Sequence, residues 1–107
     1  MLSITTKYPK EFNEYLIKKI KGDLKKSSLF FHPSFIFRDE EYSMDKCIDS
    51  LSIFRGRIFF KLEIVIKHLV YNRRQLFWLE IMKNYQTNLG KEFFLWKSKQ
   101  SKKKRII

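Results

Sequence analysis

The chain has 107 residues and a formal net charge of +12, because 23 Lys and Arg outnumber 11 Asp and Glu. This length leaves room for one domain with one modest core, and the single cysteine, Cys47, excludes an internal disulfide framework. No apolar run approaches the ~18–20 residues of a transmembrane helix, and residues 1–10 lack the apolar core of a signal peptide.

The excess of positive charge predicts a polyanionic partner, because such a charge repels itself within a compact fold. Nucleic acid and an anionic membrane surface are the two alternatives, and we favour nucleic acid. The frequent Phe, Ile, Lys, Tyr and Asn are typical of an AT-rich coding sequence. That composition indicates an organelle, an AT-rich bacterium or a virus.

A helix is predicted over residues 9–21. Pro9 suits a first helical turn, and one apolar face is formed at helical spacing by Phe12, Tyr15, Leu16 and Ile20. Three lysines crowd the last turn, and Gly22 is placed to end the helix. The lysines complement the helix dipole, and a second role in contacting RNA stays open.

Residues 23–47 are less regular. An aromatic run is expected to be extended, with Pro33 arguing against a central strand. The acidic cluster of the chain follows it, made by Asp39, Glu40, Glu41 and Asp45. These carboxylates lack the spacing of metal ligands, so we expect a solvated loop or a protein-facing patch.

The tripeptide Arg55-Gly56-Arg57 lies between two apolar runs. Glycine allows a close approach of the backbone, and two arginines beside it could form a fork for phosphate. The same three residues fit an ordinary basic turn equally well.

Residues 62–82 predict a long β-hairpin. Side chains alternate from Leu62 to Val70 in a β-branched context that favours a strand. Asn72, Arg73 and Arg74 would form a basic tip, and a second strand would follow. His68, alone on an apolar strand, is expected to be packed rather than to bind a metal.

These elements predict an α+β fold, with an N-terminal helix packed on a small, mainly antiparallel β-sheet. Residues 1–90 would form a single RNA-binding domain, in which residues 23–49 are an insertion and Gly90 closes the fold. Residues 91–107 are a basic extension with one acid, Glu92, against seven cations. We expect this tail to be disordered until RNA orders it.

The sequence contains no catalytic constellation. It has no glycine-rich phosphate loop, no Cys/His metal spacing and no Ser-His-Asp arrangement. We therefore expect no enzyme activity, no cofactor and no metal. Two alternatives stay open: a small basic RNA-cleaving toxin acting through scattered Arg, Lys and Tyr, and a DNA-binding or anionic-membrane accessory protein.

Three segments match the motifs of one family in order and spacing. They are KYPKEFNEYLIKKI, VYNRRQ with the residues after it, and NLGKEF with its lysine-rich tail. In them the chain resembles the ribosomal small-subunit protein S-nineteen family. The matching positions are Lys7, Phe12, Tyr15, Leu16, Lys18, Lys19, Ile20, Val70, Tyr71, Asn72, Arg74, Gln75, Leu89, Gly90, Glu92 and Phe93, with Ser52, Arg55 and Ile58 as a weaker counterpart of a further motif. Arg73 stands where the family has glycine, Lys91 is inserted, and residues 23–49 have no family role.

The resemblance implies a structural constituent of the small ribosomal subunit, which binds rRNA in the subunit head beside an S-thirteen-like protein. It implies a tail directed toward the decoding region and its tRNA. With the AT-rich composition, it places the protein in the mitochondrial matrix and in the mitochondrial ribosome, made inside the organelle; a plastid or the bacterial cytoplasm is the alternative.

Contacts with rRNA are expected mainly through phosphates. The residues predicted to make them are Lys7, Lys10, Lys18, Lys19, Arg55, Arg57, Asn72, Arg73, Arg74, Gln75, Asn88, Lys91, Lys97, Lys99, Lys102, Lys103, Lys104 and Arg105.

Overall fold

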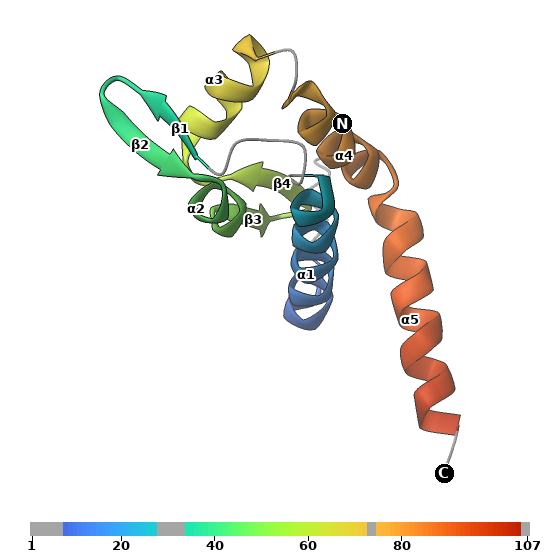
Figure 1. The fold of residues 1–107 in the computed structure, drawn as a ribbon. Helices are drawn as coiled ribbons and strands as arrows, with labels where there is room; N and C mark the ends of the chain where they lie inside the picture. The colour runs from blue at the N-terminus through green and yellow to red at the C-terminus, as the bar shows by residue number, and fades with distance from the viewer. Residues whose placement is uncertain (1–7, 28–33, 73–74, 106–107) are drawn as a thin grey trace.

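The computed structural model describes residues 8–27, 34–72 and 75–105, with side chains up to residue 101 at the C-terminal end. The elements are α1 (Lys10–Ser27), β1 (Ser34–Phe37), β2 (Glu40–Ser43), α2 (Met44–Asp49), β3 (Leu51–Phe54), β4 (Arg57–Phe60), α3 (Glu63–Tyr71), α4 (Leu76–Thr87) and α5 (Leu89–Arg105). The α+β class and the N-terminal helix are confirmed (Figure 1). The strands form two separate antiparallel pairs, β1–β2 and β3–β4, rather than one sheet.

Helix α1 supports the core and contacts α2, β3 and α4. The predicted apolar stripe is confirmed, since Phe12, Leu16 and Ile20 are fully buried. The helix does not end at Gly22 but continues to Ser27, because Leu24 adds another fully buried side chain at the next helical repeat. Burial of a leucine side chain is worth about 1.5–3 kcal/mol, which exceeds the ~1 kcal/mol cost of a glycine inside a helix.

The two β-hairpins have the same kind of turn. In each, two residues join the strands, and both have positive φ: Arg38 (49°) and Asp39 (64°) in the first, Arg55 (50°) and Gly56 (76°) in the second. Two positive φ angles are typical of the type I′ turn, whose twist matches that of the paired strands. The Arg55-Gly56-Arg57 segment is therefore a turn.

The acidic cluster does not form a loop. Asp39 lies in the β1–β2 turn, Glu40 and Glu41 are exposed on β2, and Asp45 lies in the first turn of helix α2. The Ser43 hydroxyl caps this helix by accepting a hydrogen bond from the backbone N–H of Lys46. A carboxylate in the first turn also suits the positive end of the helix.

The hairpin predicted over residues 62–82 is wrong, because α3 and α4 occupy that stretch. The buried residues of each helix are four apart: Val65 and Leu69 in α3, Trp78 and Met82 in α4. Apolar residues occur on both alternating faces of this segment, so its alternation carried little information. Packing of the residues four apart against the core stabilises two helices instead.

The C-terminal residues up to Arg105 form helix α5, whereas we expected the chain after Gly90 to be disordered until RNA orders it. Gly90 lies in the first helical turn, and a side chain there would meet nothing within 4 Å. The helix is docked on α1 by aromatic rings: Phe93 and Trp96 lie 5.0 and 5.6 Å from Phe12, between ring centroids. This packing gives α5 the tertiary support that a strongly cationic helix lacks by itself.

Two further side chains lie at contacts between elements. Cys47 of α2 is fully buried, and this burial raises the pKa of its thiol to about 11. His68 of α3 stacks on Phe35 of β1, with 3.7 Å between ring centroids. His68 is thus packed against an aromatic ring, as the sequence predicted, and it links the β1–β2 hairpin to α3.

Candidate nucleic-acid interface

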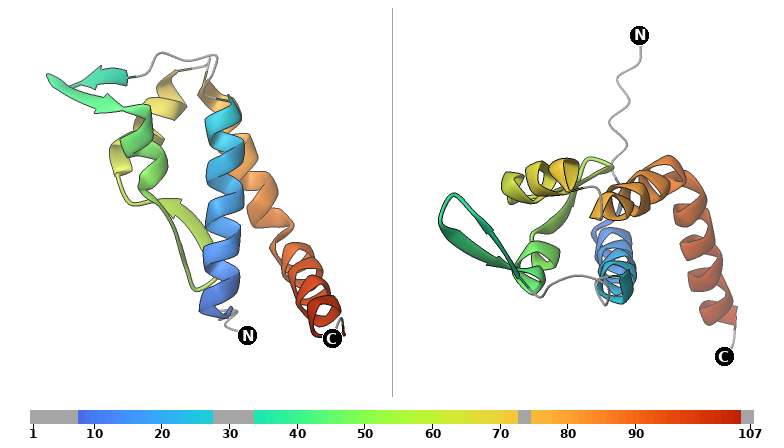
Figure 2. Two further views of the ribbon diagram at one scale, coloured as in Figure 1. Left: turned by 60° about the horizontal axis from the view of Figure 1, so that its bottom comes forward. Right: turned by 45° about the horizontal axis from the view of Figure 1, so that its top comes forward.

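Exposed cations lie at one end of the molecule, and the carboxylates of the β1–β2 hairpin lie at the other, where the last turn of α1 also has Lys25 and Lys26. The first turn of α1, the β3–β4 turn and the last turns of α5 lie toward one end, whereas the β1–β2 hairpin with its acidic residues lies toward the other (Figure 2). We call the first the basic end. It holds Lys10, Arg55, Lys97 and Lys99 on exposed positions, so residues far apart in the sequence are brought together there.

A groove lies between the start of α1 and the β3–β4 hairpin, and we call it the α1–hairpin groove. Its volume is about 380 Å³, and it is lined by Tyr8, Lys10, Asn13, Ile53, Phe54 and Arg55. The lining combines two cations, two aromatic rings and one amide. The sequence pointed to the two cations but not to the aromatic rings.

The β3–β4 turn has an exposed ring, Phe54, with two arginines as its neighbours. The Arg55 guanidinium lies 5.2 Å from the centroid of the Phe54 ring. Arg57 is the cross-strand partner of Phe54, so the two residues share one face of the hairpin. Both arginines are exposed and available to a ligand.

The same turn is held in place by Gln86 of α4. The Gln86 side chain donates from Nε2 to the carbonyl oxygen of Gly56 at 2.8 Å and accepts at Oε1 from the N–H of Ile58 at 2.8 Å. These bonds fix the backbone on both sides of Arg57. Gln86 is therefore a positioning residue that the sequence analysis missed, because no local pattern connects it to a turn 30 residues away.

A second groove lies between α1 and α5 on the other side of the same helical turn, and we call it the α1–α5 groove. It has a volume of about 760 Å³ and is lined by Pro9, Glu11, Tyr15, Trp96, Lys97, Gln100 and Ser101. Lys99 lies 5.9 Å from the ring centroid of Tyr15, and Lys97 lies 5.3 Å from that of Phe93. Cation–π contacts hold these lysines beside the groove.

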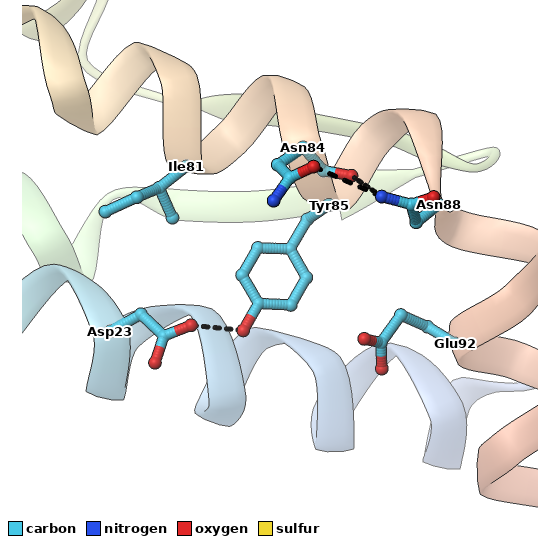
Figure 3. A pocket seen from close by; sticks show the side chains of 6 residues that line it. All are labelled: Asp23, Ile81, Asn84, Tyr85, Asn88 and Glu92. Carbon is cyan, nitrogen blue, oxygen red and sulfur yellow. Dashed lines mark hydrogen bonds between the residues drawn. The ribbon is translucent and has the colours of Figure 1, made fainter.

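A polar cluster fixes α5 against α1 and α4 (Figure 3). The Tyr85 hydroxyl donates a hydrogen bond to Asp23, and the Lys19 ammonium pairs with Glu92 at 3.0 Å. Burial and the bond to Asp23 raise the pKa of Tyr85, and the hydrogen bond to Glu92 raises the pKa of Lys19. The cavity among these groups is about 230 Å³. Since its polar groups satisfy one another, we assign the cluster to the support of α5.

The other predicted contact residues fall into three groups. Lys18 and Lys91 are exposed on helices, whereas Lys19 is committed to its ion pair with Glu92. Three polar residues serve helix ends: Asn72 is the C-cap of α3, Gln75 is buried at the start of α4, and Asn88 joins α4 to α5 while its side chain donates to the Asn84 carbonyl at 3.0 Å. Their position within the fold leaves them out of the interface that we describe.

The remaining predictions concern residues at the limits of the described structure. The structure describes only the backbone of the last four cationic residues of α5, Lys102, Lys103, Lys104 and Arg105. Lys7, Arg73 and Arg74 lie outside the described residues.

Within residues 8–27, 34–72 and 75–105, no three His, Cys, Asp or Glu side chains gather as metal ligands would. None of the helices described in these ranges is long and apolar enough to span a membrane. No protein-family model, curated protein or solved structure matches this chain.

Proposed function

We propose that this chain is an RNA-binding protein whose basic end contacts the phosphate backbone of a folded RNA. The observation that carries the proposal is the meeting of Lys10 and Arg55, from distant parts of the sequence, on one groove that also exposes aromatic rings. The net charge of +12 supports it, because each cation that neutralises a phosphate releases counterions.

The acidic hairpin at the opposite end gives the molecule an orientation. Asp39, Glu40 and Glu41 are exposed there and would be repelled by phosphates. The basic end would therefore face the RNA, while the β1–β2 hairpin faces solvent or a neighbouring protein.

As the setting we propose the small ribosomal subunit, with the protein a structural constituent in its head beside an S-thirteen-like protein, in mitochondria. This part rests on the sequence resemblance and the composition. The match at VYNRRQ lies in the segment where helices α3 and α4 replace the hairpin predicted from side-chain alternation, so the setting needs its own test. Co-sedimentation of the tagged protein with small subunits at moderate salt is expected, and its recovery only in other fractions would contradict the setting.

RNA binding is tested by a pair of matched substitutions. Arg55→Asn removes one cation from the basic end, and Arg38→Asn removes the equivalent cation from the acidic hairpin; asparagine tolerates the positive φ of both sites. Affinity for a structured RNA is measured over a series of salt concentrations. Arg55→Asn should weaken binding and reduce the slope of log affinity against log salt by about 0.7–0.9.

Arg38→Asn should leave both quantities unchanged. Equal effects of the two substitutions would place the contact elsewhere, and failure of the unaltered protein to bind RNA would refute the proposed function.

A further inference from the structure

Phe54 is an unusual surface residue. It is 63% exposed, while its neighbour Ile53 on the opposite face of β3 is only 8% exposed. The Arg55 guanidinium lies over its ring, and Arg57 is its partner across the hairpin. An exposed phenyl ring framed by cations combines the two features with which proteins hold single-stranded nucleic acid, a stacking surface and phosphate-binding charge.

The α1–hairpin groove lies beside this ring. Tyr8 and Asn13 of the α1 side face Ile53 and Phe54 of the hairpin side, with Lys10 and Arg55 among the lining residues. Its volume of about 380 Å³ is within the range of small-ligand sites. The Asn13 Oδ1 atom is buried and has no hydrogen-bond partner within the described structure, so an acceptor is left over on this wall.

We propose that the α1–hairpin groove binds an unpaired base of single-stranded RNA, stacked on Phe54. Arg55, Arg57 and Lys10 take the phosphates on either side of it. Asn13 also lines the groove, and a turn of its side chain would bring the buried, unpartnered Oδ1 atom to an N–H on the edge of the base. This inference rests on the proposed function and adds the class of RNA that the site selects.

The geometry selects an unpaired base for a physical reason. Inside a duplex, both faces of a base are covered by its neighbours, so neither can stack on a protein ring. In a loop or bulge the base can turn outward. Arg55 is exposed and can move from the Phe54 ring to a phosphate or to the second face of the base, because guanidinium planes also stack on bases.

The test uses a short single-stranded RNA with the fluorescent base 2-aminopurine, and the same sequence closed into a duplex. Phe54→Leu removes the stacking ring at an exposed position. Phe37→Leu is the matched control, since Phe37 also precedes an arginine turn, at the other end of the molecule. Phe54→Tyr keeps an aromatic ring.

The unaltered protein should bind the single strand more tightly than the duplex and quench the 2-aminopurine. Phe54→Leu should weaken single-strand binding about 5- to 150-fold, as expected for the loss of one stacked base, and abolish the quenching. Phe37→Leu and Phe54→Tyr should keep both the affinity for the single strand and the quenching.

Three results would overturn the inference, and they can be told apart. If single strand and duplex bind equally and Phe54→Leu changes nothing while Arg55→Asn weakens binding, the stacking site is refuted but RNA binding stands. If Phe37→Leu weakens binding as much as Phe54→Leu, the effect does not belong to this groove. If no RNA binds the unaltered protein, both proposals fail.

Discussion

Arg38 and Arg55 occupy equivalent positions in the two β-hairpins. Each is the first residue of a two-residue turn, with φ of 49° and 50° respectively. Each guanidinium lies over the phenylalanine before it, at 5.4 Å from Phe37 and 5.2 Å from Phe54. The local structure is thus the same, and the surroundings differ: acidic side chains around Arg38, a groove with Lys10 around Arg55. Arg38 can therefore serve as an internal control for the function of Arg55.

Two glycine substitutions should change stability in opposite directions. Gly56 has φ of 76°, so Gly56→Ala should lower the free energy of unfolding by about 1–2 kcal/mol, the cost of a left-handed conformation for a residue with a Cβ. Gly22 lies inside α1, where an added Cβ meets nothing within 4 Å. Gly22→Ala should raise the free energy of unfolding by about 1 kcal/mol. Urea denaturation measures both, and a stabilising Gly56→Ala would contradict the turn geometry.

Gln86→Ala should loosen the β3–β4 turn. The substitution removes two hydrogen bonds to the turn backbone, each worth about 0.5–1.5 kcal/mol. Because the bond to the Gly56 carbonyl is exposed to solvent, the free energy of unfolding should fall by about 1–2 kcal/mol. RNA affinity should fall as well, because Arg55 and Arg57 lose their fixed position. Thr87→Ala, at the neighbouring exposed position, is the control. An affinity equal to that of the unaltered protein would show that Gln86 does not position the site.

Much of α1 and the β3–β4 turn could be predicted from sequence, because their signals are local. A regular apolar stripe fixed the buried face of α1, and Gly56 marked a turn. The end of α1 was mispredicted since an exposed glycine has only a small cost when Leu24 continues the buried stripe. The β1–β2 turn was missed because Arg38 and Asp39 supply no glycine at positions with positive φ.

The rest of the site depends on tertiary structure. Arg55 was selected from its charge, but its groove partners Tyr8 and Asn13 come from the other end of the domain sequence. Nothing local distinguishes Phe54 from the buried phenylalanines, since the run contains apolar residues on both faces of the strand. Only the packing of Ile53 inward shows that Phe54 points outward.

His68 should make stability depend on pH. Burial lowers the pKa of His68 in the folded chain below its ordinary value of 6.5. Above that value both states are neutral and His68 has no effect; as pH falls through 6.5, the unfolded chain binds the proton more readily, so the free energy of unfolding decreases. Urea denaturation between pH 7.5 and 5 measures this. His68→Gln should reduce the decrease, and an identical pH dependence in that variant would contradict the prediction.

Deletion of residues 97–107 should preserve the fold and weaken RNA binding. The rings that dock α5, Phe93 and Trp96, remain, as does the ion pair of Lys19 with Glu92. If the tail makes ~4–6 phosphate contacts, the salt slope should fall by about 3–5. A second variant with Lys102, Lys103, Lys104 and Arg105 all changed to Gln keeps the chain length and should show a smaller fall. An unchanged slope in the deletion would exclude the tail from binding.

Because Cys47 is buried, the rate at which its thiol is labelled reports how often the domain opens. The chain has one cysteine, so any thiol-reactive reagent reports on a single site. In the closed fold this thiol is fully buried and its pKa is about 11, so the reactive thiolate is scarce and inaccessible at neutral pH. Labelling then proceeds only through states in which α2 separates from α1, and its rate measures how often they form. Because Cys47 lies outside both grooves, a slower rate in the presence of RNA would show that a ligand at the basic end restrains motion in the distant half of the molecule.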